Sequence, residues 1–173
     1  VRRDALAAAA EMALAIEAVA AAKPAELVAT VGKFHVDHPA ANVIPGRVEF
    51  SIDLRSGNDA ARRDAEAGII ARLKAIATRR NVDATLAPYH DSRAVPCDPA
   101  LMDRLDAAIT ACGLPVRRLP SGAGHDAMTV ADVASVAMLF VRCGAGGISH
   151  NPKESLTAED AGFAAQAFEQ FLL

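Results

Sequence analysis

Apolar and polar residues alternate strictly along residues 47–55, RVEFSIDLR. Val48, Phe50, Ile52 and Leu54 are the apolar positions, and charged or small polar residues separate them. A period of two is typical of a half-buried antiparallel strand, and a register slip of one residue would expose all four apolar side chains. The pattern predicts that this strand packs its apolar face against helices.

The segments around this strand predict a mixed helix and strand unit. Strong helix formers fill residues 4–22, and the helix ends before Pro24. Residues 59–80 predict a second helix with a stripe of Ile69, Ile70, Leu73, Ile76 and Ala77. Residues 26–36 and 81–89 predict two more strands. The order corresponds to a split βαββαβ unit, ferredoxin-like, without its first strand.

The pattern changes after the turn-rich residues 90–99, which contain two prolines and mark a domain boundary. Helices are predicted at residues 100–112, at about 125–132 and from Thr157 onward, and strands at residues 116–119 and 136–141. Alternating helices and buried strands indicate an α/β layer. The last helix is predicted to bury one apolar stripe, made of Phe163, Ala164, Ala167, Phe168 and Phe171.

Composition limits the partners of the chain. Of its 173 residues 52% are hydrophobic and 23% charged, and the net charge of −3 gives no basic surface for nucleic acid or an anionic membrane. A small polar substrate or a protein partner remains. Three widely spaced cysteines favour a reducing, cytoplasmic location over disulfides or a thiolate zinc site. With no signal peptide, membrane span or initiator methionine, the chain is expected to be a fragment.

The glycine-rich stretch SGAGHDAM, residues 121–128, is a first candidate site. It suits a strand-to-helix turn that brings backbone N–H groups and His125 to a substrate oxygen, and the alternative, which the residues taken alone favour, is a turn in which His125 and Asp126 cap the next helix. Ser121, His125 and Asp126 are not expected to form a hydrolase triad, because the GxSxG turn is absent and the three lie too close in sequence.

His150 lies in a second glycine-rich loop, after the predicted strand 136–141. Ligands of open α/β sheets bind beyond the carboxyl ends of the strands, so this imidazole is a candidate metal ligand. The alternative is a loop histidine that bonds local backbone. A zinc site needs at least three protein ligands, and no HxxxH or HExxH spacing supplies them.

Asn42 and Arg55 lie at the two ends of the central strand with its preceding turn. Arginine is well shaped to hold a carboxylate through two hydrogen bonds, and asparagine can donate and accept beside it. The alternative is an exposed strand arginine paired with Glu49 or Asp53, together with a turn asparagine.

Three stretches together resemble one family: ANVIPGRVEFSIDLRS, LPSGAGHDAM and GGISHNPKES. They are similar to the allantoate amidohydrolase and N-carbamoyl-L-amino-acid hydrolase group of the M20 metallopeptidase-like family. The resemblance implies that residues 1–93 form most of an α+β lid and dimerisation domain, and that residues 94–173 form the C-terminal part of an α/β catalytic domain. It also implies hydrolysis of a carbamoyl or ureido C–N bond.

The resemblance assigns roles to five residues. His150 is implied as a ligand of one of two divalent ions, zinc or manganese, and Gly124 and His125 as contacts of the substrate. Asn42 and Arg55 are implied to bind the substrate carboxylate in the neighbouring subunit of a homodimer. The family's other metal ligands and its catalytic glutamate are not in this chain, so no catalytic residue is assigned and the chain alone is expected to be inactive. An M20 peptidase or aminoacylase, or a non-catalytic dimerisation module, are the alternatives.

Overall fold

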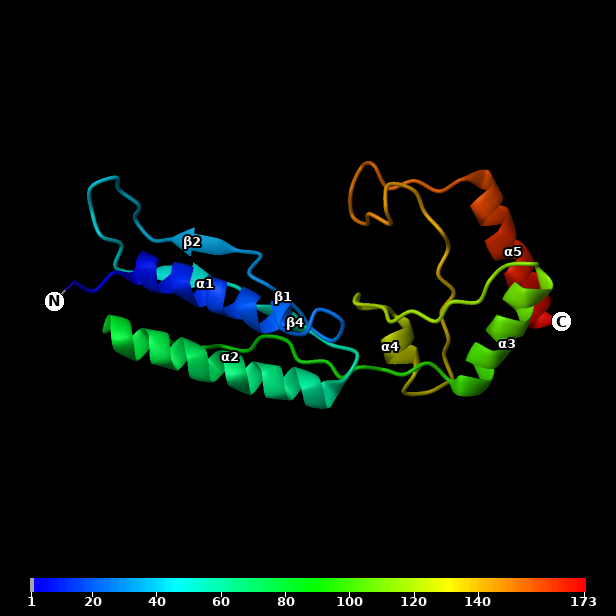
Figure 1. Ribbon diagram of the computed structural model, residues 1–173, viewed down its shortest axis with the longest axis horizontal. Coiled ribbons are helices and arrows are strands. Elements are labelled where there is room, and N and C mark those ends of the chain that lie inside the picture. The colour runs from blue at the N-terminus through cyan, green and yellow to red at the C-terminus, as the bar shows by residue number, and fades with distance from the viewer. Residues whose placement is uncertain (1) are drawn as a thin grey trace. The chain divides into compact units, whose positions relative to one another are not determined.

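The computed structural model describes residues 2–173. The chain divides into two compact units, unit 1 at Val1–Ala94 and unit 2 at Val95–Leu173. Unit 1 contains α1 (Ala5–Ala21), β1 (Val28–Thr30), β2 (Phe34–Val36), β3 (Val48–Phe50), β4 (Asp53–Arg55) and α2 (Asp59–Arg80) (Figure 1). Unit 2 contains α3 (Pro99–Ala111), α4 (Ala127–Val130) and α5 (Ala158–Leu172).

The two long helices of unit 1 begin at side-chain caps and form where the sequence predicts them. Asp4 accepts a hydrogen bond from the N–H of Ala7 at 3.0 Å. Asn58 accepts from the N–H groups of Ala60 and Ala61 at 2.9 and 3.2 Å. Each cap satisfies backbone donors that the first helical turn leaves without a partner.

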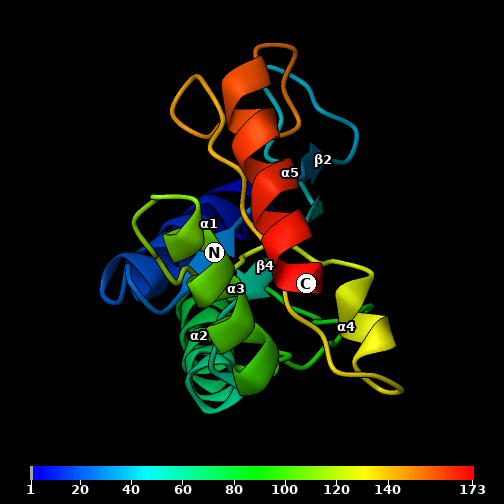
Figure 2. The same ribbon diagram turned by 90° about the vertical axis from the view of Figure 1, so that its right-hand side faces the viewer.

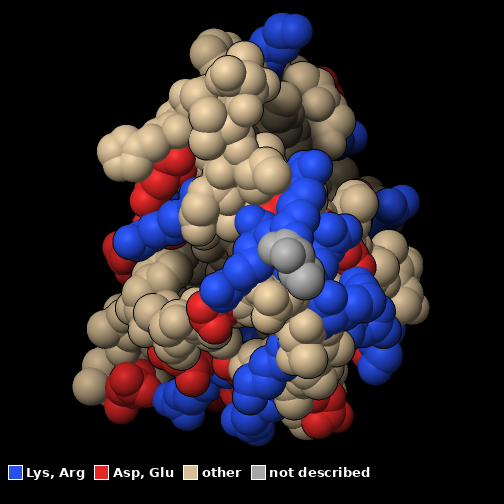
Figure 3. Space-filling model, turned by 90° about the vertical axis from the view of Figure 1, so that its left-hand side faces the viewer, with Lys and Arg blue, Asp and Glu red and all other residues tan. Residues whose placement is uncertain are grey.

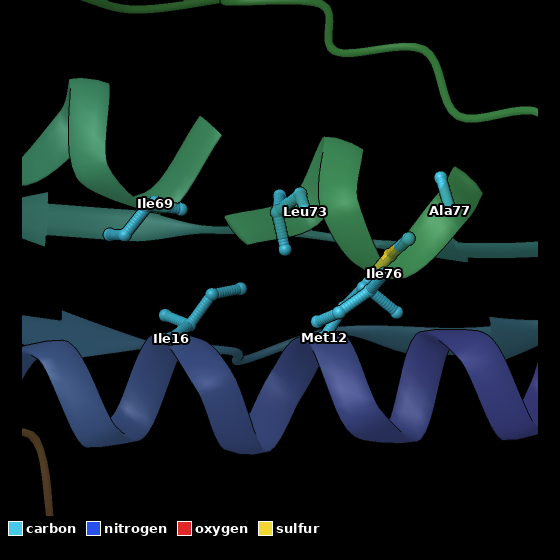
Figure 4. Close-up of a cluster of buried hydrophobic side chains, with 6 residues drawn as sticks. All are labelled: Met12, Ile16, Ile69, Leu73, Ile76 and Ala77. Atoms are coloured by element: carbon cyan, nitrogen blue, oxygen red, sulfur yellow. The ribbon is translucent and has the colours of Figure 1, made fainter. Parts of the chain in front are cut away.

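The core of unit 1 lies between these helices and the sheet. Met12 and Ile16 of α1 meet a stripe on α2, as Figure 4 shows; the α2 residues are Ile69, Leu73, Ile76 and Ala77. Ile70 of the predicted stripe is only half-buried. Phe50, Ile52 and Leu54 pack against this cluster, which confirms the predicted inward face for these three residues, whereas Val48 is half-buried and does not belong to the cluster.

The predicted hairpin is interrupted in its middle by a bulge in its first strand, at residues 31–33. β2 pairs antiparallel with β3 so that Phe34 faces Phe50, and β1 pairs with β4 so that Thr30 faces Asp53. Between the two ladders, residues 31–33 stand opposite residues 51–52 only. The Ser51 hydroxyl accepts the N–H of Lys33 at 3.0 Å within this bulge. One strand therefore carries one residue more than its partner, as in a β-bulge.

The bulge changes which residues of its strand face the helices. Before it, Ala29 and Val31 point to the core; after it, Phe34 lies on the same side, where its ring stacks on Phe50 with centroids 5.8 Å apart. Side chains alternate between the two faces of a strand, so Ala29 and Val31 would normally lie on the face opposite to Phe34. All three lie on the same face because the bulge inserts one extra residue between them.

Residues 81–89 do not form the predicted strand. Asn81 ends α2 in the left-handed conformation with φ of 53°, and the residues after it belong to neither of the two-stranded sheets in the described chain. A strand needs a neighbour to take its backbone hydrogen bonds. Unit 1 is therefore two helices with a small antiparallel sheet, and a complete ferredoxin-like unit is not observed.

Unit 2 is built on the packing of α3 against α5. Figure 2 shows the ribbons of these two helices side by side. Leu105 and Ala108 of α3 and Ala167 of α5 are buried, and the guanidinium of Arg104 lies 4.6 Å from the ring centroid of Phe171. Within the predicted stripe of α5 only Ala167 is buried, and Phe168 is 49% exposed. The wide buried stripe predicted for this helix is therefore wrong.

The two strands predicted in unit 2 are also absent. Residues 116–119 and 136–141 are extended segments without ladder partners among residues 2–173. Val136 accepts one hydrogen bond from the N–H of Asp98 at 2.8 Å. Further along the second segment, Phe140 and Val141 are exposed. The α/β layer predicted here is not formed by the described residues, because both segments have no strand beside them.

Candidate functional site

The loop that carries His150 is closed at its base by a backbone hydrogen bond. The N–H of Gly144 donates to the carbonyl oxygen of Ser155 at 2.8 Å, and the N–H of Gly147 donates to Gly144 at 3.0 Å. Ala145, Gly146 and Gly147 follow in the left-handed region, with φ between 50° and 79°. The glycine-rich sequence thus folds into a local loop just before α5.

His150 has a backbone conformation that side chains rarely adopt. Its φ is 56°, and its N–H donates to Oε2 of Glu154 at 3.0 Å. The N–H of Lys153 in turn donates to Oδ1 of Asn151 at 3.0 Å. Left-handed non-glycine residues cost free energy and persist where neighbouring bonds hold them. Glu154 supplies such a bond, and the imidazole of His150 lies at the exposed surface.

The residues of this chain do not by themselves form a metal centre. Within residues 2–173 no three His, Cys, Asp or Glu side chains are placed to hold one ion. Zinc requires at least three protein ligands. His150 therefore supplies at most one donor of such a site.

His125 is hydrogen-bonded to Ser121 in the second candidate stretch. Ser121 Oγ lies 2.7 Å from Nε2 of His125, and the N–H of Ala123 donates to the same Oγ at 3.2 Å. Asp126 stands at the N-cap of α4, but its side chain makes no capping bond. The capping alternative is therefore wrong for the Asp126 side chain, and Ser121 and His125 form a hydrogen-bonded pair that the sequence analysis did not predict.

Gly124 offers an open backbone next to His125. Nothing lies within 4 Å of the position that a Cβ at Gly124 would take, and both residues are exposed. A ligand can therefore approach the main chain of the turn directly, which is a common use of glycine.

Arg55, in unit 1, is paired with Asp53 on its own strand. Its Nε lies 2.6 Å from Oδ1 and its Nη2 lies 2.8 Å from Oδ2 of the carboxylate. The hydrogen bond from Arg55 lowers the pKa of Asp53, and the same contact raises the pKa of Arg55. The strand ion pair raised as an alternative is thus present, and it already demonstrates the two-pronged binding of a carboxylate.

Asn42 lies in the loop between β2 and β3, away from Arg55. The loop borders an open groove of about 440 Å³ at the beginning of α1, lined on one side by Asn42, Val43 and Ile44. Arg55 ends β4 at the other end of the hairpin (Figure 1). Unit 1 alone therefore does not bring these two side chains together.

Charge on the surface is mixed. Figure 3 shows Lys and Arg side chains gathered on one face with Asp and Glu beside them. The ion pairs of unit 1 include Arg2 with Asp4 and Arg3 with Asp83. Of the helices in residues 2–173, none combines the length and the apolar character that a membrane span requires.

The family follows from comparison with known proteins. Residues 5–173 match Peptidase family M20/M25/M40, and the chain belongs to this family. It is 40% identical over 156 residues to allantoate deiminase of Arabidopsis thaliana, covering 84% of this chain and 29% of that protein. It is 38% identical over 165 residues to N-carbamoyl-L-amino acid amidohydrolase of Geobacillus stearothermophilus, covering 95% and 40%.

A solved structure agrees in fold. An amidase of the hydantoinase/carbamoylase family from Burkholderia multivorans matches with a TM-score of 0.93 and 34% identity, over 99% of this chain and 42% of that one. The family resemblance read from the three sequence stretches is confirmed. The chain spans less than half the length of these relatives.

Sequence reasoning missed two residues at the candidate sites. Glu154 accepts the backbone N–H of His150. The sequence pattern did not indicate this contact because it depends on the left-handed backbone at His150. Ser121 was considered only as a nucleophile, although its spacing of four from His125 across a glycine-rich turn could have suggested a side-chain contact.

Proposed function

We propose that this chain is the C-terminal part of a metal-dependent amidohydrolase that cleaves a carbamoyl or ureido C–N bond of allantoate or an N-carbamoyl amino acid. The observation that carries the proposal is similarity along 84–95% of the chain to enzymes named for these two substrates. The free cysteines, Cys97, Cys112 and Cys143, suit a cytoplasmic enzyme.

Unit 2 contributes the polar contacts of the catalytic domain in this proposal. His150 provides one imidazole to one of two divalent ions, zinc or manganese, and the other ligands belong to the rest of a longer protein. Gly124 and His125 contact the substrate. The support is local: an exposed imidazole on a loop closed by Gly144 and Ser155, and an open backbone beside His125.

Arg55 binds the carboxylate of the substrate in this proposal. Its guanidinium already holds the carboxylate of Asp53 through two donors, so binding exchanges one carboxylate for another of the same shape. Asn42 contributes a second polar contact from the β2–β3 loop, and both residues act in the site of a neighbouring subunit.

Unit 1 serves as the lid and dimerisation domain. Its support is the groove at the start of α1, whose lining includes Leu6 and Val43, which are 37% and 59% exposed. Contiguous exposed apolar surface marks sites of association. Residues 81–89 and 136–141, which have no ladder partner among residues 2–173, gain neighbouring strands from the remainder of the protein.

Ammonia release by the full-length protein tests this function. After incubation with zinc or manganese, it is expected to release ammonia from allantoate or from an N-carbamoyl-L-amino acid, and to leave N-acetyl-L-amino acids and dipeptides intact. Hydrolysis of the acetylated or peptide substrates alone would instead assign an aminoacylase or a peptidase. Inactivity on all of them, with metal bound, would favour a dimerisation module.

A further inference from the structure

The hydroxyl of Ser121 makes two hydrogen bonds at once. It lies 2.7 Å from Nε2 of His125, and it accepts the backbone N–H of Ala123 at 3.2 Å. A hydroxyl has one hydrogen to donate and two lone pairs. The bond from Ala123 uses one lone pair, so the hydroxyl hydrogen and the second lone pair remain for the contact with the imidazole.

We infer that Ser121 is a positioning residue that donates its hydroxyl hydrogen to Nε2 and thereby keeps neutral His125 in the tautomer with its proton on Nδ1. In the other tautomer Nε2 would donate to Oγ, which would then accept two hydrogen bonds while its own hydrogen lost its partner in the turn. The partner of one ring nitrogen decides what the other can do.

This tautomer makes His125 a hydrogen-bond donor at Nδ1. A neutral imidazole with Nε2 occupied by Ser121 can hold an oxygen acceptor at its free edge, such as a ureido carbonyl or a carboxylate. It cannot remove a proton through Nδ1. The identity of that acceptor rests on the proposed function, whereas the tautomer rests only on the contacts of Ser121 within unit 2.

A second serine–histidine pair provides a matched control. Ser92 Oγ lies 2.9 Å from Nε2 of His90 in unit 1. In the described chain Ser92 shows no backbone N–H donor comparable to that of Ala123, so its hydroxyl is free to accept or donate. The two pairs contain the same groups and differ in the backbone bond to the hydroxyl and in their charged surroundings, since His90 lies close enough to Asp53 to lower the pKa of that carboxyl.

Nitrogen NMR of the ¹⁵N-labelled 173-residue chain tests the inference. Spectra are recorded at a pH well above the ordinary pKa of histidine, where a ring nitrogen without a proton resonates far from one that carries it. The His125 signals are assigned by their loss in His125→Gln. The expected result is an unprotonated Nε2 and a protonated Nδ1 in the wild type.

Substitutions at Ser121 then separate positioning from bulk structure. Ser121→Ala is expected to abolish the preference for Nδ1–H, Ser121→Thr to retain it, and Ser92→Ala to leave the His125 signals unchanged. An unprotonated Nδ1 in the wild type, or an unchanged tautomer in Ser121→Ala, would overturn the inference. If the alanine variant unfolds, the wild-type and threonine spectra still decide.

Activity distinguishes this inference from the proposed function. In the full-length enzyme His125→Gln should raise the KM for substrate more than it lowers kcat, and Ser121→Ala should show a smaller change in the same direction. If NMR shows the Nδ1–H tautomer but His125→Gln leaves turnover unaltered, the substrate role of His125 is rejected. The tautomer assignment then remains valid.

Discussion

Gly144 meets Ser155 across the base of the His150 loop, where the Ser155 hydroxyl occupies the space that a side chain at position 144 would take. A Cβ at position 144 would lie 2.5 Å from Oγ of Ser155 and 3.6 Å from its carbonyl oxygen. Gly144→Ala therefore requires the Ser155 hydroxyl to turn away, and it should destabilise unit 2 by about 0.5–1.5 kcal/mol, the usual cost of an unfavourable side-chain rotamer. Urea denaturation followed by circular dichroism measures this loss.

The contact also predicts a rescue. Ser155→Ala removes the atom in conflict, so the double variant Gly144→Ala/Ser155→Ala should recover most of the stability. Gly162→Ala is the matched control: it lies inside α5 with nothing within 4 Å of its Cβ position, and should stabilise by about 0.5–1 kcal/mol. A double variant no more stable than Gly144→Ala would contradict the steric explanation.

Truncating two residues of α1 to alanine should have very different effects on the stability of the fold. Ile16 is 1% exposed within the core, whereas Leu14 is 66% exposed. Ile16→Ala should lower the free energy of unfolding by about 2–5 kcal/mol, and Leu14→Ala should change it by less than about 0.5 kcal/mol. Chemical denaturation of both variants checks this. Equal losses would mean that α1 packs through a different face.

Acid should weaken the start of α5 through Asp160. The Thr157 hydroxyl donates to this carboxylate at 2.6 Å and the Nε of Arg142 donates at 2.7 Å, and these bonds lower the pKa of Asp160 below its ordinary value. A group whose pKa is lowered by folding stabilises the fold above its unfolded pKa. That contribution is lost as pH falls through the ordinary aspartate value of about 3.9 toward the lower folded pKa.

Asp160→Asn tests this dependence. The variant should be less stable than the wild type at neutral pH, and the difference should shrink below about pH 4, where the native carboxyl also becomes neutral. Arg142→Gln should show part of the effect, since the Thr157 bond remains. Thermal melts between neutral and acidic pH provide the measurement, and a difference independent of pH would speak against the assignment.

Zinc should bind this chain weakly. His150 offers one ligand, and no cluster of three donors exists among residues 2–173. Calorimetric titration should show no tight stoichiometric site, and His150→Ala should change little. A tight zinc site that His150→Ala abolishes would contradict this prediction, because it would require further ligands that the described structure does not place near His150.

Arg55 can be tested in the full-length enzyme by a substitution that retains its charge. Arg55→Lys loses the planar two-pronged geometry, and a charge-assisted hydrogen bond is worth about 1.5–3 kcal/mol, so kcat/KM should fall by roughly 10- to 150-fold. Arg47 is the control, an exposed arginine directly before β3 that pairs with Asp37 and Glu49. Arg47→Lys should leave kcat/KM unchanged.

Mixed subunits test whether Arg55 serves the neighbouring site. Inactive Arg55→Ala and His150→Ala subunits are mixed under conditions of verified exchange, and heterodimers should regain part of the activity. If activity is not recovered, Arg55 does not act in the neighbouring site. It is then a surface residue of β4 that pairs with Asp53.

The helices of unit 1 were predictable because their signals are local. Asp4 and Asn58 cap at the positions that the sequence indicates, and apolar residues recur at helical spacing. The bulge in the hairpin was missed, although Gly32 within an otherwise apolar strand pattern is a typical sign of one. Side-chain alternation in residues 47–55 gave the inward face correctly, since that strand has no inserted residue.

The other predicted strands did not form, because local pattern does not determine whether a segment finds a pairing partner. Residues 81–89 and 136–141 have suitable side chains, but ladder formation depends on a neighbouring strand that local sequence does not encode. The pairing of Arg55 with Asp53 shows a similar limit, because the same arginine fits a strand ion pair and a substrate clamp. The structure shows the ion pair, and this pair is compatible with the proposed substrate role.

The extended segment at residues 136–141 also bears on how the chain behaves in concentrated solution. VAMLFV has six apolar residues, no charge and no proline, and Phe140 and Val141 lie exposed within it. Short apolar segments with free backbone groups pair with copies of themselves and seed β-aggregates. Purified by itself, the chain should turn cloudy and bind thioflavin T as its concentration rises, and replacing Met138 with lysine should suppress both.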